Sequence, residues 1–145
     1  MTLLLLVLLL AIIAYTYCFM VLKKDLKLMH NIQKSKECGN DVLDTEGYLL
    51  CIEDSMILDD FYFYKDIIKA MPKNQSCKVI SFNISEEATN VKLMEGINLR
   101  NIPSIMYINK QRESKEIFNF NDLDEHFGTK DIIKLVTEVL KKNKN

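Results

Sequence analysis

Residues 99–110 read LRNIPSIMYINK and carry the clearest structural signal in the chain. Proline has no backbone N–H to donate, so Pro103 belongs at the first residue of a strand rather than within one. The apolar run at 105–108 is typical of a buried strand, and a second run at 116–120 is close enough to pair with it as a hairpin. This stretch therefore predicts a strand over 105–108, shortly after the proline, that pairs with a second strand over 116–120.

Upstream of the proline, strands alternate with helices. Apolar runs at 48–52 (YLLCI) and 77–84 (CKVISFNI) predict two buried strands. Between them, Asp54 and Ser55 can cap a helix over 56–71. The residues that fall at helical spacing in that segment are Ile57, Phe61, Tyr64, Ile68 and Met71.

Two more helices complete the pattern. A short helix is expected over 85–95, before Gly96, and a C-terminal helix follows a Thr129 cap. Strand, helix, strand, helix, hairpin and closing helix indicate an α/β fold, with a central mixed sheet of about four strands flanked by helices.

The N-terminal residues 3–22 (LLLLVLLLAIIAYTYCFMVL) contain no charge. Twenty helical residues reach about 30 Å, the thickness of the hydrocarbon core of a bilayer. A cleaved signal peptide is the alternative, with Ala14 and Thr16 as a poor cleavage site, but its usual basic region is missing before the apolar run. The pattern favours one retained transmembrane helix, which makes the bilayer a partner of residues 3–22.

The flanks of this segment indicate its orientation. Lys23, Lys24 and Lys27 follow it directly, and positive residues tend to stay on the cytoplasmic side. Two glycosylation sequons, at Asn74 and Asn83, would suit the opposite orientation. We therefore predict a single-pass membrane protein whose domain faces the cytosol.

Between the anchor and the first strand, Leu22, Leu26 and Met29 fall at helical spacing among charged residues. This predicts an amphipathic helix over 23–36, followed by a turn-prone linker. The expected division is an anchor at 1–22, the helix and linker at 23–46, the α/β domain at 47–142 and a tail at 143–145.

Composition excludes several functions. The formal net charge of −1 argues against a nucleic-acid-binding surface. His30 and His126 share no metal-ligand spacing with a cysteine pair, and no phosphate-binding glycine loop is present, so neither a metal nor a cofactor is expected. Among 19 basic residues only Arg100 and Arg112 are arginines, a bias typical of A+T-rich genomes such as those of large DNA viruses or protists.

Residues 99–104, with the strand after them, resemble the thioredoxin family's segment of a hydrophobic residue, Arg, Gly or Ser, Ile, Pro and Thr. Residues 79–84 resemble the strand that precedes that segment, and the likeness covers about 47–142. It implies a thioredoxin-like fold, a cis Ile102–Pro103 bond, and a groove at Ile102, Pro103 and Ser104. A trans proline that merely begins a strand is the alternative.

The departure from this family concerns its chemistry. The family uses Cys-x-x-Cys at the start of the helix after the central strand, and alignment places Met56-Ile57-Leu58-Asp59 there. The family's buried carboxylate falls on Leu50. We therefore predict that Met56 and Asp59 mark a degenerate active site and that the chain has no catalytic residue.

The cysteines leave one alternative open. Cys18 lies in the apolar N-terminal segment and Cys51 in a core strand, whereas Cys38 and Cys77 lie near element ends. A Cys38–Cys77 disulfide is possible in an oxidising compartment, and reduced thiols are expected in the cytosol.

Two functional hypotheses follow. In the first, the chain is a redox-inactive binding or structural module in a membrane-associated complex with unidentified protein partners; in a large DNA virus the setting would be the virion membrane or capsid. In the second, it is a thiol-disulfide oxidoreductase or chaperone-like protein that uses Cys51 or Cys77. A filled groove with no binding role is the third reading. Asp122, Asp124 and Glu125 form either a solvated loop or a docking surface.

Overall fold

The computed structural model describes residues 2–34, 38, 40–44, 46–55, 60–83, 87–123 and 126–143. The chain divides into two compact units, residues 1–31 and residues 32–145.

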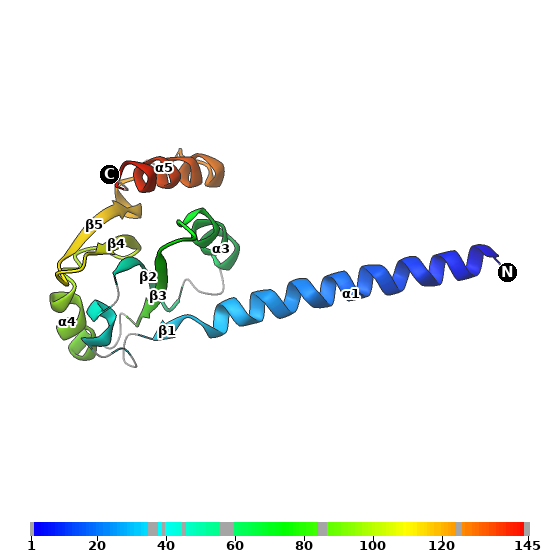
Figure 1. The fold of residues 1–145 in the computed structure, drawn as a ribbon, viewed down its shortest axis with the longest axis horizontal. Helices are drawn as coiled ribbons and strands as arrows, with labels where there is room; N and C mark the ends of the chain where they lie inside the picture. The colour runs from blue at the N-terminus through cyan, green and yellow to red at the C-terminus, as the bar shows by residue number, and fades with distance from the viewer. Residues whose placement is uncertain are drawn as a thin grey trace. The chain divides into compact units, whose positions relative to one another are not determined.

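The first unit is a single helix, α1 (Thr2–His30; Figure 1). Its segment Leu3–His30 is long and apolar enough to cross a membrane. Thr16 is polar, but its hydroxyl donates to the carbonyl oxygens of Ile12 and Ile13, at 3.0 and 2.9 Å. The helix therefore satisfies this polar side chain internally, as a lipid environment requires.

The helix ends earlier than the amphipathic pattern predicted. It stops at His30, and strand β1 (Gln33–Lys34) follows, where a helix to residue 36 was expected. The reason is tertiary: Ile32 packs against the core of the second unit, and β1 pairs in parallel with the strand formed by Ser76–Phe82. The segment 23–46 is thus part of the folded unit from residue 32 onward and not only a linker.

The second unit contains a mixed sheet in the order β1-β3-β2-β4-β5. The other strands are β2 (Gly47–Glu53), β3 (Ser76–Phe82), β4 (Ser104–Ile108) and β5 (Ser114–Asn119). Strand β3 runs parallel to β1 and β2, whereas β4 is antiparallel to both β2 and β5. The predicted α/β class and its mixed sheet are confirmed, with four full strands and a two-residue fifth at the edge.

The central strand β2 is buried on both faces, which explains its continuous apolar sequence. Successive side chains alternate between the faces. Tyr48, Leu50 and Ile52 belong to one hydrophobic cluster, and Leu49 and Cys51 belong to another.

Helices cover both faces of the sheet (Figure 1). The helices α3 (Phe61–Ala70) and α5 (Thr129–Lys142) pack on the face of Leu50, which we call the first face. The helix α4 (Glu87–Gly96) and the 3-10 helix η2 (Asn40–Asp44) pack on the face of Cys51, the second face. A short 3-10 helix, η4 (Phe120–Asp122), follows β5.

Two helix starts differ from prediction. Helix α3 begins at Phe61 with Asp60 as its N-cap, and the expected caps are used elsewhere: the Asp54 N–H donates to the Phe82 carbonyl oxygen (2.9 Å), which extends the β2–β3 pairing. The Ser55 hydroxyl bonds to the Glu53 carboxylate at 2.6 Å. Helix α5 is capped by Gly128, so Thr129 is its first helical residue.

Candidate binding groove

The three residues predicted to form a groove lie at the start of β4, and they point in different directions. The Ile102–Pro103 peptide bond is cis, as the resemblance implies. Ile102 packs against the second-face cluster, and Ser104 is fully buried opposite Cys51 in the β2–β4 register. Pro103 lines an open cavity.

We call this cavity, of about 430 Å³, the proline groove. Its walls come from the start of α3, from η4 and from the start of α5. The apolar lining consists of Phe63, Tyr64, Pro103, Phe120, Leu123 and Ile132. Asp60, Asn121, Phe127 and Thr129 complete it.

Hydrogen bonds fix the segment after β5 against the backbone around Pro103. The Phe120 N–H donates to the Pro103 carbonyl oxygen at 3.2 Å, and the Asn121 side-chain amide donates to the Ile102 carbonyl oxygen at 3.1 Å. The Asn119 side chain accepts the Asn121 N–H at 3.0 Å. The segment after β5 is thereby tied to the backbone around Pro103.

Aromatic rings form the interior of the groove. Phe120 meets Phe63 edge-to-face, with ring centroids 5.7 Å apart, and meets Phe118 at 5.0 Å. Such tilted pairs are the favoured geometry for aromatic side chains. They give the groove a preformed apolar wall.

A bulge in the sheet explains how Phe120 reaches the groove. The β4–β5 register shifts by one residue between Ile105 and Met106, so that Ile105 faces Phe118 and not Ile117. Because side chains alternate along a strand, a shift of one residue exchanges the two faces. The bulge thus places Phe118 and Phe120 on the first face.

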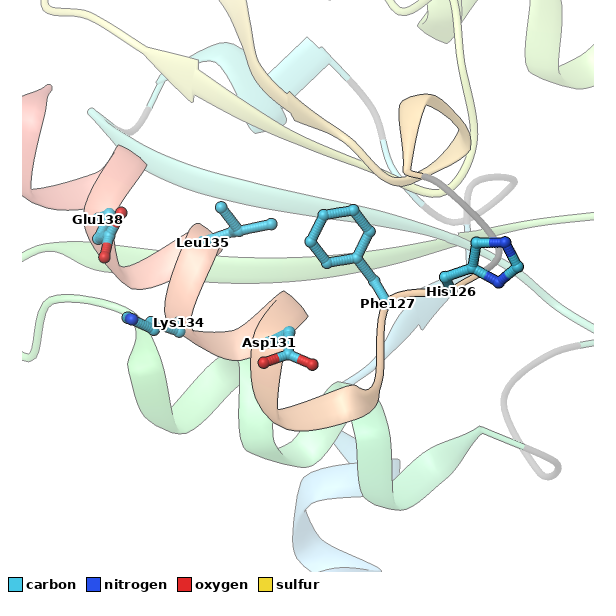
Figure 2. Close-up of a pocket in the computed structure, with 6 residues that line it drawn as sticks. All are labelled: His126, Phe127, Asp131, Lys134, Leu135 and Glu138. Atoms are coloured by element: carbon cyan, nitrogen blue, oxygen red, sulfur yellow. The ribbon is translucent and has the colours of Figure 1, made fainter.

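A second cavity of about 350 Å³ lies along α5, and we call it the α5 hollow (Figure 2). It is lined by His126, Phe127, Asp131, Lys134, Leu135 and Glu138. Figure 2 shows the Phe127 ring and the Leu135 side chain extending toward one another, with the charged residues along the same helix. Phe127 lines both cavities and is 44% exposed.

One of the residues that line the groove, Tyr64, carries an ionisable hydroxyl. The pKa of the Tyr64 hydroxyl is raised above its ordinary value, first by burial and then by the negative charges of Asp60 and Glu53. Tyr64 is already uncharged at physiological pH at its ordinary pKa of 10.0, and the raised pKa extends that range upward.

The thiols lie away from the groove. Cys51 is fully buried on the second face, and burial, Glu116 and Cys38 raise its pKa. Cys77 is a free, half-buried thiol that packs against the first-face cluster, and burial raises its pKa to about 11. Cys38 is half-buried against the second-face cluster. A thiol nucleophile needs a lowered pKa, so neither Cys51 nor Cys77 has the electrostatic setting for exchange chemistry.

Several predicted positions lie outside the described residues. These are the degenerate active-site segment, Met56 to Asp59, and the acidic residues Asp124 and Glu125. Asp122, by contrast, is exposed in η4. Leu50, aligned with the family's buried carboxylate, is fully buried in the first-face cluster.

The sequence pattern does not reveal the phenylalanines that line the groove. From the sequence, Phe120 is expected at the end of a strand, and neither Phe63 nor Phe127 stands out. The one available signal was the density of phenylalanines around the last strand and the loop after it. Within the described segments, no group of three or more His, Cys, Asp or Glu side chains is placed to hold a metal ion.

Comparison with protein-family models, with curated proteins and with solved structures finds no match to this chain. Any function assigned to the groove therefore rests on its own geometry and chemistry.

Proposed function

We propose that this chain is a membrane-anchored, redox-inactive protein with a thioredoxin-like fold, which binds a protein partner in the proline groove within a membrane-associated complex. One observation carries the proposal. The groove is open and lined by aromatic and apolar side chains, and Cys38, Cys51 and Cys77, the cysteines of the same compact unit, are not among its lining residues. A groove of this kind can bind, but it has no sulfur with which to exchange a disulfide.

The order of elements supports the thioredoxin-like part of the proposal. Strand, helix, strand, helix, hairpin and closing helix follow one another from β2 to α5, the order to which the resemblance pointed. The proline segment precedes β4, next to the carboxyl end of β2. In open α/β sheets, ligands bind in the crevice outside the carboxyl ends of the strands.

The position of the groove also suits peptide binding. An extended segment can lie along an exposed edge or groove and use both its main chain and its side chains. Pro103 and the aromatic rings beside it supply an apolar floor. Asn121 and Thr129 are exposed polar residues at the rim.

The anchor and its orientation belong to the same proposal. The helix α1 would hold residues 32–145 at a membrane, and Lys23, Lys24 and Lys27 favour the cytosolic side. Asn74 lies exposed in the turn before β3, so its glycosylation in cells would reverse this orientation. A virion membrane is the setting that the compositional bias suggests.

Site-specific photocrosslinking of the full chain in its native membranes tests the proposal. A photoreactive phenylalanine analogue at Thr129, which lines the groove, should capture one discrete protein, and the same analogue at exposed Lys110 in the β4–β5 turn should not. In parallel, the purified full chain should not accelerate insulin reduction by dithiothreitol. Equal capture from both positions, or catalysed insulin reduction, would refute the proposal.

A further inference from the structure

The proline groove does not end at α5. Phe127 lies between it and the α5 hollow and lines both, so the two cavities are adjoining parts of one surface. Asp131, Lys134, Leu135 and Glu138 are spaced at i, i+3, i+4 and i+7, which places them on one stripe of α5. That stripe is distinct from the residues of α5 that pack in the core, such as Val136 and Leu140.

The combined surface has an acidic character. Its lining includes three carboxylates, Asp60, Asp131 and Glu138, and one ammonium group, Lys134. In the part of the chain that the structure describes, these carboxylates form no ion pair. Their charge is therefore available to a ligand, while Phe127 and Leu135 offer an apolar contact between them.

We propose that the α5 hollow extends the proline groove and selects a basic segment of the partner, with an apolar side chain beside Phe127 and a Lys or Arg near Asp131 and Glu138. This inference rests on the proposed function, because it specifies what the groove binds. The occupant it commits to is an extended, positively charged peptide segment of another protein.

The chemistry separates this occupant from others. An acidic peptide would meet like charge at Asp131 and Glu138, and an anionic lipid surface is attracted by basic clusters rather than by carboxylates. The apolar contact should supply most of the affinity, because anchoring aromatic side chains dominate interfaces. Exposed charges contribute mainly to selectivity and to the association rate.

Two fluorescent peptides provide the probe. Both contain a central Leu-Phe pair; one is flanked by lysines and the other by glutamates. Binding is measured by fluorescence anisotropy to the full chain in nanodiscs whose phosphatidylcholine bilayer carries no net charge, and binding to empty nanodiscs is subtracted. We expect the basic peptide to bind about tenfold more tightly than the acidic one, with a preference that shrinks as salt rises.

Matched variants locate the binding. Phe127→Ala should weaken binding of the basic peptide about tenfold, and Glu138→Lys should weaken it about threefold. The controls are Val91→Ala, which is 45% exposed on α4, and Glu95→Lys, in the last turn of the same helix. Both controls should leave binding unchanged. Glu138 and Glu95 are both exposed near the ends of their helices, so neither charge reversal should unfold the protein.

Each result decides the inference. Equal binding of both peptides, no binding of the basic one, or equal losses in the control variants would overturn it. Self-association of the chain that is lost in Phe127→Ala would also overturn it, because the occupant would then be a second copy. If Thr129 captures a partner while the peptides show no charge preference, the proposed function stands and only this extension fails.

Discussion

The two faces of the sheet share the same strands but differ in how they are covered. On the second face, α4 and η2 pack over residues that are almost entirely inaccessible, including Cys51, Ile80 and Phe82. On the first face, α3 and α5 also enclose a core, yet beyond it lie an open groove and an adjoining hollow lined by aromatic rings.

This difference indicates which face of the sheet has room for a ligand. A face that is filled to the usual density of a protein interior has no room for a ligand. A preformed apolar hollow with a few polar groups at its rim is the usual form of a binding site. The described residues of the second face form a nearly inaccessible core, whereas the first face combines a core with two open cavities.

A charged side chain in the first-face core should strongly lower the free energy of unfolding. Leu50 is fully buried there, beneath the helices, so Leu50→Asp would place a carboxylate in a dry cluster. Loss of the apolar contacts costs about 2–5 kcal/mol, and burial of the charge adds to this. We expect a loss of more than about 4 kcal/mol, measured by pulse proteolysis in urea on the full chain. Leu50→Met, which conserves volume, should cost less than about 1.5 kcal/mol. Equal stability of the two variants would contradict a dry core at this position.

The sequence predicts the core of both faces, because buried strands and helices leave regular patterns of apolar residues. Continuous apolar runs marked β2 and β3, and helical spacing marked α5. The two-residue strand β1 has no pattern of its own, since only its pairing with β3 defines it. The sequence favours an earlier start for α3 than Phe61, because Asp54 is a typical N-cap residue. In the structure the Asp54 N–H instead donates to the Phe82 carbonyl oxygen and continues the β2–β3 pairing.

The buried thiol of Cys51 and the half-buried thiol of Cys77 should report the same difference between the faces. Cys77, on the first face, has a pKa raised to about 11, so at pH 8 it should react with iodoacetamide about a hundredfold more slowly than a cysteine in an unstructured peptide. Its rate should rise about tenfold per pH unit up to pH 11. Cys51, closed in on the second face, should react only after unfolding.

The sign of the pH effect follows from the raised pKa. The folded state keeps the Cys77 thiol protonated above its ordinary pKa of 9.0, so the stability it contributes is complete below that pH and is lost as pH rises through about 11. Cys77→Ala should remove this part of the pH dependence. Rapid labelling of Cys77 at pH 7 would instead indicate a reactive thiolate, and would favour the thiol-enzyme hypothesis.

Two serines allow a smaller test, which concerns the hydrogen bonds of their hydroxyls. The Ser104 hydroxyl is buried and has no hydrogen-bond partner among the described residues. Ser104→Ala should therefore stabilise the protein by up to about 1 kcal/mol, because an unsatisfied hydroxyl is removed. Ser114 is the matched control, since its hydroxyl donates to the Ile97 carbonyl oxygen, and Ser114→Ala should destabilise by about 1 kcal/mol. Urea midpoints of the two variants should shift in opposite directions, and a destabilised Ser104→Ala would mean that its hydroxyl has a partner.

The site was only partly predictable, for a physical reason. The resemblance implies a groove at Ile102, Pro103 and Ser104; of these, Pro103 lines the cavity, whereas Ile102 packs against the second-face cluster and Ser104 is buried. The groove's aromatic wall depends on the bulge near Ile105, which shifts Phe118 and Phe120 to the first face. Local periodicity does not reveal a register shift, because the shift is defined only by the partner strand.

The smallest effect should come from Phe127, which lines both cavities. Phe127 is 44% exposed, so Phe127→Ala should lower the free energy of unfolding by about 1 kcal/mol or less. Phe82, which is 1% exposed on the second face, is the matched control, and Phe82→Ala should cost about 3–5 kcal/mol. Pulse proteolysis of both variants gives the two values under the same conditions. If the losses were equal, Phe127 would be a structural residue, and its position between the two cavities would reflect packing and not recognition.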